Sequence, residues 1–150
     1  MTAPGYSVEA LVPQAPPMVL LDGIESLGDS EIRARVTVRQ DSMFARDGGV
    51  PVHVGIEYMA QTCAAFAGYE ARQSGGEPQI GLLLGTRKFS ATRGFFQPGD
   101  VLSVIAVLSY REEGMGVFDC VVECDGDVVA QASLTVFQPK EPVTFSAGPS

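Results

Sequence analysis

The sequence predicts a single α+β domain in which a curved antiparallel sheet wraps around one long central helix. Residues 52–73 contain no proline, are rich in helix formers and carry apolar residues nearly all the way round the helix. Alternating apolar and polar residues predict strands on both sides of this helix. The length of 150 residues and the hydrophobic fraction of 45% suit one domain with a sizeable core. We expect residues 1–138 to form that domain and residues 139–150 to be a flexible C-terminal tail.

The individual strands are predicted from alternation and from the turn residues between them. Prolines in residues 1–17 disfavour a helix there, and a short apolar run follows at residues 18–22. Residues 31–39 alternate cleanly, which predicts a half-buried strand, and a loop leads from there to the helix. The helix is expected to end at Ser74-Gly75-Gly76. Further strands are predicted over residues 80–92, 101–111, 117–124 and 128–137, with turns at 96–100, near Gly114 and at 125–127.

The order of these elements favours a hot-dog fold. A helix that is apolar on every side must be buried, and a curved antiparallel sheet is the economical way to bury it. Such a sheet covers only part of the helix surface. We therefore expect a second copy of the chain to cover the remainder.

Composition and charge exclude several classes of function. Eighteen acidic against ten basic residues give a net charge of −8, which disfavours nucleic-acid binding. No apolar run approaches ~18 residues, so no membrane span is expected. The N-terminus lacks the features of a secretion signal, and the three cysteines show no CxxC spacing, so reduced thiols and a cytoplasmic location are expected. With one histidine and no phosphate-binding glycine motif, we expect neither a metal nor a cofactor.

The candidate site lies at the start of the predicted helix. His53, Glu57 and Gln61 recur every four residues and fall on one stripe of the helix. A carboxylate in a largely apolar helix is costly to bury unless it is hydrogen-bonded, and Gln61 is placed to bond Glu57. Glu57 therefore suits acid–base chemistry, with His53 as a second candidate. The plainer interpretation is a surface carboxylate that complements the helix dipole and a solvated histidine at the helix start.

A local excess of basic residues follows the helix. Between residues 72 and 93, this otherwise acidic chain has a single acidic residue, Glu77, and four basic residues: Arg72, Arg87, Lys88 and Arg93. These residues would suit an anionic partner, or they are simply the solvated face of a strand.

Five segments in register resemble the 3-hydroxyacyl-acyl-carrier-protein dehydratases of type II fatty acid synthesis, the FabZ family. They cover roughly residues 8–138 and comprise Leu11–Asp22, Ile56–Gln61, Leu84–Phe89, Phe96–Asp100 and Gly126–Ala132. Within them, Ile-Glu-Tyr-Met-Ala-Gln is similar to the family's Ile-Glu-Ala-Met-Ala-Gln helix start. The longer strings Val54–Gln61 and Gly81–Arg87 look more like the dehydratase-like hot-dog proteins of aryl-polyene biosynthetic clusters.

The resemblance implies a dimer with active sites at the subunit interface and an acyl carrier protein as the donor of substrate. Glu57 matches the family's helix glutamate, whereas the family's loop histidine, supplied by the other subunit, corresponds here to Met43. His53 could replace that histidine only if the loop is rebuilt. We expect substrate-binding roles for Phe44, Gly55, Gln61, Arg87 and Lys88.

The function that follows is elimination of water from a 3-hydroxyacyl thioester to give a trans-2-enoyl thioester, in fatty acid or polyene-type lipid biosynthesis. In this interpretation His53 is the base and Glu57 is the acid or its orienting partner, and a backbone N–H at the helix start polarises the thioester oxygen. Two alternatives remain open. One is a hot-dog acyl thioesterase, and the other is a non-catalytic subunit that pairs with an active paralogue in a heterodimer.

Overall fold

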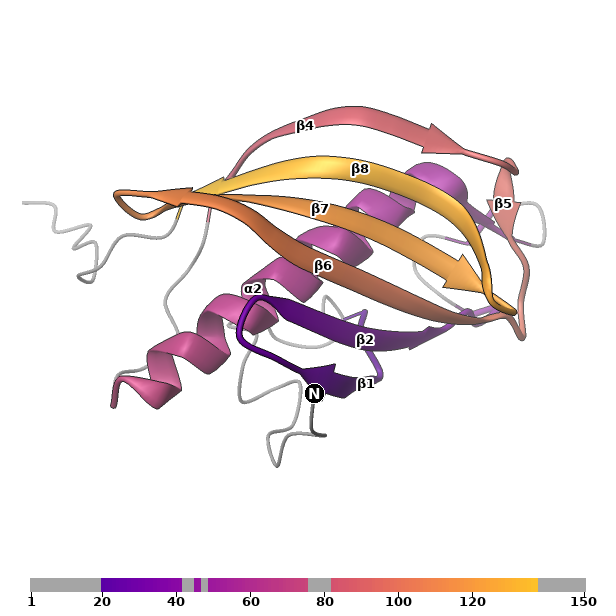
Figure 1. The fold of residues 1–150 in the computed structure, drawn as a ribbon. Coiled ribbons are helices and arrows are strands. Elements are labelled where there is room, and N and C mark those ends of the chain that lie inside the picture. The colour runs from indigo at the N-terminus through magenta and orange to yellow at the C-terminus, as the bar shows by residue number, and fades with distance from the viewer. Residues whose placement is uncertain (1–19, 42–44, 47–48, 76–81, 138–150) are drawn as a thin grey trace, which may run out of the picture.

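A six-stranded antiparallel sheet curves over one side of a long helix (Figure 1). The computed structural model describes residues 20–41, 45–46, 49–75 and 82–137. The sheet order is β1 (Gly23–Leu27), β2 (Glu31–Thr37), β6 (Val101–Glu112), β7 (Met115–Cys124), β8 (Asp127–Phe137) and β4 (Leu82–Ala91). Neighbouring strands are all antiparallel. The predicted fold class is therefore confirmed, and β1 and β4 form the two edges of the sheet.

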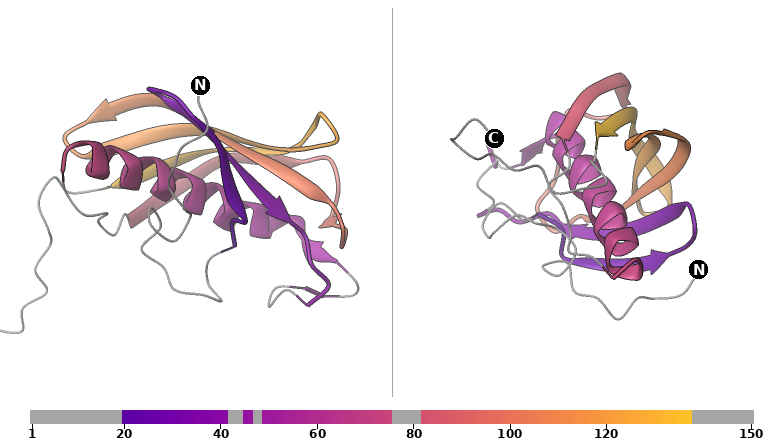
Figure 2. Two further views of the ribbon diagram at one scale, coloured as in Figure 1. Left: turned by 90° about the horizontal axis from the view of Figure 1, so that it is seen from below. Right: turned by 90° about the vertical axis from the view of Figure 1, so that its left-hand side faces the viewer.

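The helix α2 (Gly55–Gln73) lies along the concave side of the sheet, as Figure 2 shows. A 3₁₀ turn, η1 (Val52–Val54), precedes it, so that together they fill the predicted helical range of 52–73. Apolar side chains that face the sheet are fully buried, and the Phe66 ring meets the Phe118 ring edge-on with 5.8 Å between centroids. Residues Ile56, Ala60, Ala64 and Ala67 form a half-buried face. The helix is thus covered less evenly than its all-round apolar sequence predicts.

The first strand differs from the sequence expectation. The sequence draws attention to the apolar run at residues 18–22, but the strand β1 lies after it, at Gly23–Leu27. The described residues of that run, 20–22, lead into β1. Asp22 N–H donates to the Arg35 carbonyl at 2.7 Å, so the pairing with β2 begins one residue before β1 itself. The segment Gly-Ile-Glu-Ser-Leu has little alternation, and a register shift between Ile24 and Ser26 interrupts its ladder.

A second, two-stranded ladder pairs β3 (Val50–Pro51) with β5 (Phe95–Phe96) beside the helix start. Neither strand was predicted, because two residues carry no periodicity and Pro51 lacks the N–H that a longer ladder needs. The ladder seats Phe96, which is fully buried, against Tyr58 with 5.7 Å between ring centroids. The first turn of α2 is thereby fixed relative to the loop that follows β4.

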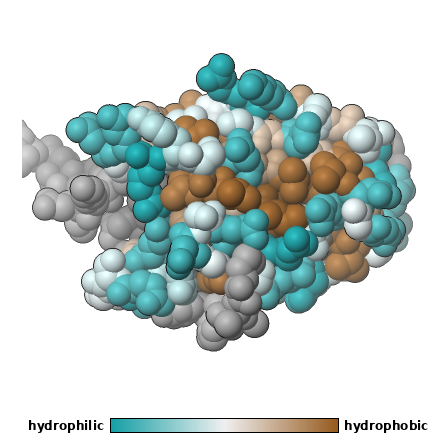
Figure 3. All heavy atoms as spheres, viewed as in Figure 1, coloured by the Kyte–Doolittle hydropathy of each residue, from teal (hydrophilic) through white to brown (hydrophobic). Residues whose placement is uncertain are grey.

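Apolar side chains also gather on the outer face of the sheet over its middle strands (Figure 3). Val101 and Val128 are 53% and 43% exposed, and Ile105 is buried although it is not part of the main core cluster. Within the described part of the chain, no helix is long and apolar enough to cross a membrane. The predicted tail, residues 139–150, lies outside the described residues.

Candidate active site

Glu57 and Gln61 form a hydrogen-bonded pair on the first turns of α2. Gln61 Nε2 donates to Glu57 Oε1 at 3.0 Å, as the four-residue spacing led us to expect. The Gln61 side chain is 1% exposed, whereas Glu57 is half-buried. Gln61 Oε1 accepts the backbone N–H of Leu20 at 2.8 Å. The carboxylate is therefore held from the buried side and remains accessible from the other.

The segment that carries Leu20 is itself anchored to β2. Asp22 accepts hydrogen bonds from the Thr37 backbone N–H and, at 3.2 Å, from the Arg39 guanidinium. Burial raises the pKa of Tyr58, on the helix, to about 12, and the negative charge of Asp22 adds to this rise. Residues 20–22 therefore lie across the first turns of α2 and link the sheet edge to the site.

His53 lies exposed in η1, one turn before Glu57. Its side chain makes no hydrogen bond or ion pair with the described residues, so it is not part of the Glu57–Gln61 group. The N–H of Gly55 donates to the carbonyls of Val52 and His53. A Cβ at Gly55 would meet the Phe96 ring at 3.4 Å, so this glycine also packs closely against the core.

The remaining predicted site residues lie in two other places. Phe44, and Met43 at the position of the family's loop histidine, are outside the described residues. Arg87 and Lys88 are both exposed on the edge strand β4, far along the sequence from the helix start. The ladder between β4 and β8 shifts register between Arg87 and Ser90, and Lys88 has a φ of 57°, which marks a bulge. The bulge turns two consecutive basic side chains outward.

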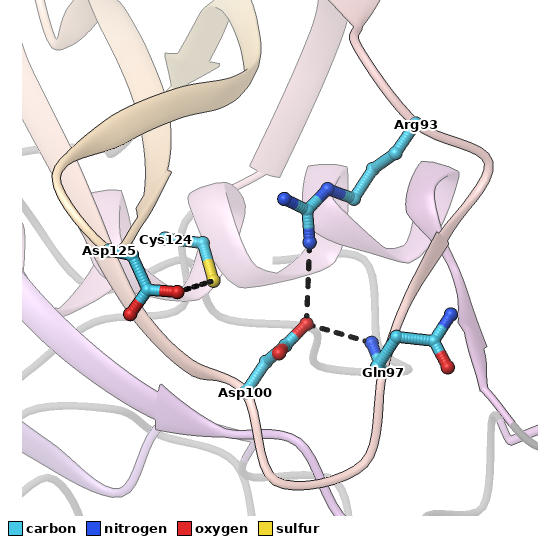
Figure 4. Close-up of polar contacts among 5 residues, drawn as sticks. All are labelled: Arg93, Gln97, Asp100, Cys124 and Asp125. Carbon is cyan, nitrogen blue, oxygen red and sulfur yellow. Dashed lines mark hydrogen bonds and ion pairs between the residues drawn. The ribbon is translucent and has the colours of Figure 1, made fainter.

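Arg93 differs from Arg87 and Lys88 because it forms an ion pair within a turn. Its guanidinium lies 3.4 Å from Asp100 Oδ2, which also accepts the Gln97 backbone N–H at 2.9 Å (Figure 4). The predicted 96–100 turn is present, with Gly99 at a φ of +92° and its N–H bonded to the Val38 carbonyl. Much of the charge of Arg93 is thus balanced locally.

The three cysteines are free thiols. Cys63 and Cys120 approach to 3.7 Å between sulfurs in the core, where burial and the Cys120 hydrogen bond raise the pKa of Cys63. Burial, then the nearby carboxylates of Asp100 and Asp125, raise the pKa of Cys124. The raised pKa values keep Cys63 and Cys124 protonated, which disfavours nucleophilic chemistry at these two thiols.

The chemistry available here is proton transfer. Glu57 offers a half-buried carboxylate with one oxygen bonded to Gln61, at the start of a helix. Among the described residues, no group of three or more His, Cys, Asp or Glu side chains could hold a metal ion. The role of Leu20 was not visible in the sequence, because a backbone N–H carries no residue signature.

Comparison with known proteins places this geometry in a family. A family model described as ApeP-like, ApeP dehydratase, matches residues 6–147. A curated FabZ 3-hydroxyacyl-acyl-carrier-protein dehydratase from Syntrophotalea carbinolica is 31% identical over 93% of this chain and 98% of its own. A second, from Levilactobacillus brevis, is 28% identical over 85% of this chain and 88% of its own.

Solved structures agree with the sequence matches. One chain in the structure of the dehydratase heterocomplex ApeI:P from Xenorhabdus doucetiae superposes with a TM-score of 0.86 at 29% identity, over 92% of this chain and 94% of that one. A hypothetical thioesterase from Streptococcus pneumoniae, solved with coenzyme A, reaches a TM-score of 0.63 at 16% identity, over 80% and 87% of the two chains, which shows the fold alone. The hot-dog fold is thus confirmed, and the chain belongs to the ApeP-like dehydratase family, related to the FabZ dehydratases.

Proposed function

We propose that this protein is a 3-hydroxyacyl-acyl-carrier-protein dehydratase that works as one half of a hot-dog dimer. The observation that carries the proposal is Glu57, a half-buried carboxylate held by Gln61 at the start of the central helix. The reaction removes a proton α to the thioester carbonyl and the hydroxyl from the β-carbon. It releases water and leaves a trans-2-enoyl thioester. No free thiol forms.

In the proposed mechanism, Glu57 protonates the departing hydroxyl and a histidine removes the α-proton. His53 is the base available in this chain, one helical turn from Glu57. The start of the helix, with its backbone N–H groups, would polarise the thioester oxygen, and Gly55 would let the thioester approach. Phe44 would contact the acyl chain.

A second hot-dog chain is the proposed partner, and the edge strand β4 supports its place. Leu83 and Leu84 on this strand are 43% and 56% exposed, and β4 pairs with β8 on one side only among the described strands. The likeness to a heterocomplex favours a related chain over an identical one. Such a partner could supply the loop histidine that Met43 replaces here, and that histidine would then be the base in place of His53.

An acidic acyl carrier protein is the proposed donor of substrate. The exposed Arg87 and Lys88 would attract it, and β4 runs toward the end of the molecule where α2 begins, as Figure 1 shows. The Val52 N–H bonds the Gly94 carbonyl at 2.9 Å, which ties the helix start to the loop after β4. Production of aryl-polyene rather than fatty acyl chains is the finer form of this proposal, and the cytoplasm is its expected location.

The test is incubation of the purified protein, alone and with its co-purified hot-dog partner, with a 3-hydroxyacyl thioester and with the corresponding enoyl thioester. Enoyl absorbance and free thiol are followed together. A change in absorbance without thiol supports the dehydratase, whereas release of thiol would show a thioesterase instead. His53→Ala assigns the base: a loss of activity makes it His53, and full activity that needs the partner makes it a partner histidine.

A further inference from the structure

Gln61 is buried between two groups that together fix which way its amide faces. Its Oε1 accepts the Leu20 backbone N–H at 2.8 Å, and its Nε2 donates to Glu57 Oε1 at 3.0 Å. A flipped amide would aim its NH₂ group at the Leu20 N–H and its oxygen at the carboxylate. Both contacts would then be repulsive, so the two partners impose one orientation.

The Leu20 N–H is a fixed donor because the segment around it is held by the sheet. Two residues later, the Asp22 backbone N–H bonds the Arg35 carbonyl at 2.7 Å, and the Asp22 side chain bonds the Thr37 N–H and the Arg39 guanidinium. A chain of contacts therefore runs from β2 through residues 20–22 to Gln61 and then to Glu57. The contacts at both ends of residues 20–22 are hydrogen bonds between defined atoms, and the backbone of these three residues joins them.

We propose that Gln61 is a positioning residue whose amide, oriented by the Leu20 N–H, holds Glu57 by Oε1 and leaves Oε2 to act on the substrate. This inference rests on the proposed function, because it assigns the oxygen that carries the proton. Gln61 Nε2 can only donate, so it requires Glu57 Oε1 to be an acceptor. Gln61 then acts through Glu57 and does not itself need to touch the substrate.

The first test compares Gln61→Met with wild type in the dehydratase assay, with the partner present if activity requires it. Methionine keeps the length of the side chain but removes both hydrogen bonds. We expect kcat to fall roughly tenfold to a hundredfold, the cost of a misplaced catalytic group, while KM changes less than about twofold. Thr62→Val is the matched control, because the buried Thr62 hydroxyl bonds the Tyr58 carbonyl at 2.7 Å on the same turn. Its kcat should equal that of wild type even if its melting temperature falls.

The second test is the pH profile of Gln61→Glu. A carboxyl at position 61 can still accept the Leu20 N–H, but it donates to Glu57 only when it carries a proton. The activity of this variant relative to wild type should therefore rise as the pH falls. A profile parallel to that of wild type, or a kcat for Gln61→Met equal to that of Thr62→Val, would overturn the positioning role.

A readout without turnover separates this inference from the proposed function. In ¹⁵N-labelled protein, the Gln61 side-chain NH₂ resonance, assigned by its loss in Gln61→Met, should exchange slowly with solvent. It should shift in Glu57→Ala. If the wild type proves inactive but this resonance behaves as described, the function fails and the positioning geometry stands. A Gln61 NH₂ resonance that exchanges rapidly with solvent and keeps its chemical shift in Glu57→Ala would overturn the geometry itself.

Discussion

At the scale of single residues, the proposed acid, Glu57, is one of two carboxylates on α2. Glu57 and Glu70 are both half-buried on α2, but Glu57 is bonded to a buried amide and Glu70 to the Arg111 guanidinium, at 3.0 Å from Nη1 to Oε2. The different partners give the two acids different roles. An ion pair such as Glu70–Arg111 contributes about 0–1 kcal/mol to stability and prepares no group for proton transfer.

Glu57→Gln should therefore abolish dehydration while leaving the fold intact. Loss of a general acid typically costs about 10²–10⁴ in rate, and glutamine keeps the size of the side chain. Turnover is measured with the 3-hydroxyacyl thioester, and folding by circular dichroism and the melting temperature. Glu70→Gln is the control on the same helix and should keep wild-type turnover. Equal activity in both variants would remove Glu57 from the mechanism.

Tyr58 makes stability depend on pH at the alkaline end. Its folded-state pKa is raised from 10.0 to about 12 by burial and by Asp22, so folding favours the protonated phenol. This contribution is fully present below pH 10 and is lost as the pH rises toward 12, because the unfolded chain ionises first. The free energy of unfolding should fall by about 1.4 kcal/mol per pH unit in that window. Urea titrations of Tyr58→Phe, which has no such group, should show a shallower slope, and identical slopes would contradict the assignment.

At the scale of elements, the sequence predicts the long ones and misses the short ones. The helix and strands β2, β6, β7 and β8 carry seven or more residues of clear periodicity, and all lie close to their expected ranges. The two-residue strands β3 and β5 carry no pattern of their own, and their ladder accompanies a tertiary contact between Phe96 and Tyr58 at the helix start. β1 pairs by proximity to β2 and not by its own pattern.

The same division holds for the candidate site. The Glu57–Gln61 bond follows from the helical repeat and could be predicted, because both residues belong to one element. The hydrogen bond between Leu20 and Gln61 joins residues 41 positions apart through a backbone N–H, so no sequence pattern predicts it. Arg93 counted as a free base in the sequence, but the folded turn pairs it with Asp100.

The bulge in β4 gives the basic pair a testable role. Arg87→Glu combined with Lys88→Glu should weaken binding of an acidic acyl carrier protein, and the loss should be larger at low than at high ionic strength. Affinity is measured by titration at two salt concentrations. Arg35→Glu is the control, because Arg35 is exposed on β2. This strand lies next to β1, at the opposite side of the sheet from β4. Equal losses at both salt concentrations would argue against an electrostatic contact.

At the scale of the whole molecule, the fold leaves one sheet edge and one helix face in need of cover. β4 is ten residues long and exposes two leucines, and the helix face of Ile56, Ala60, Ala64 and Ala67 is half-buried. A long apolar edge strand is a hazard unless another chain pairs with it. A second hot-dog chain on this edge would extend the sheet and bring its own loop toward this chain's helix start.

Leu83→Lys combined with Leu84→Lys should therefore break the dimer without unfolding the chain. Both side chains are exposed in the single chain, so the core loses little, whereas an intermolecular ladder along β4 would have to accept two charges near the start of this strand. Native mass spectrometry of the chain co-expressed with a hot-dog protein that has a histidine in the loop before its helix should show a mixed dimer for wild type and separate chains for the variant. If the partner's loop histidine is the base, dehydration at Glu57 should disappear with the dimer, because the base and Glu57 then belong to different chains. Val128→Lys, which adds charge to an exposed apolar position of β8, is the control and should keep both the dimer and the activity. A mixed dimer that survives the leucine changes would move the interface away from β4.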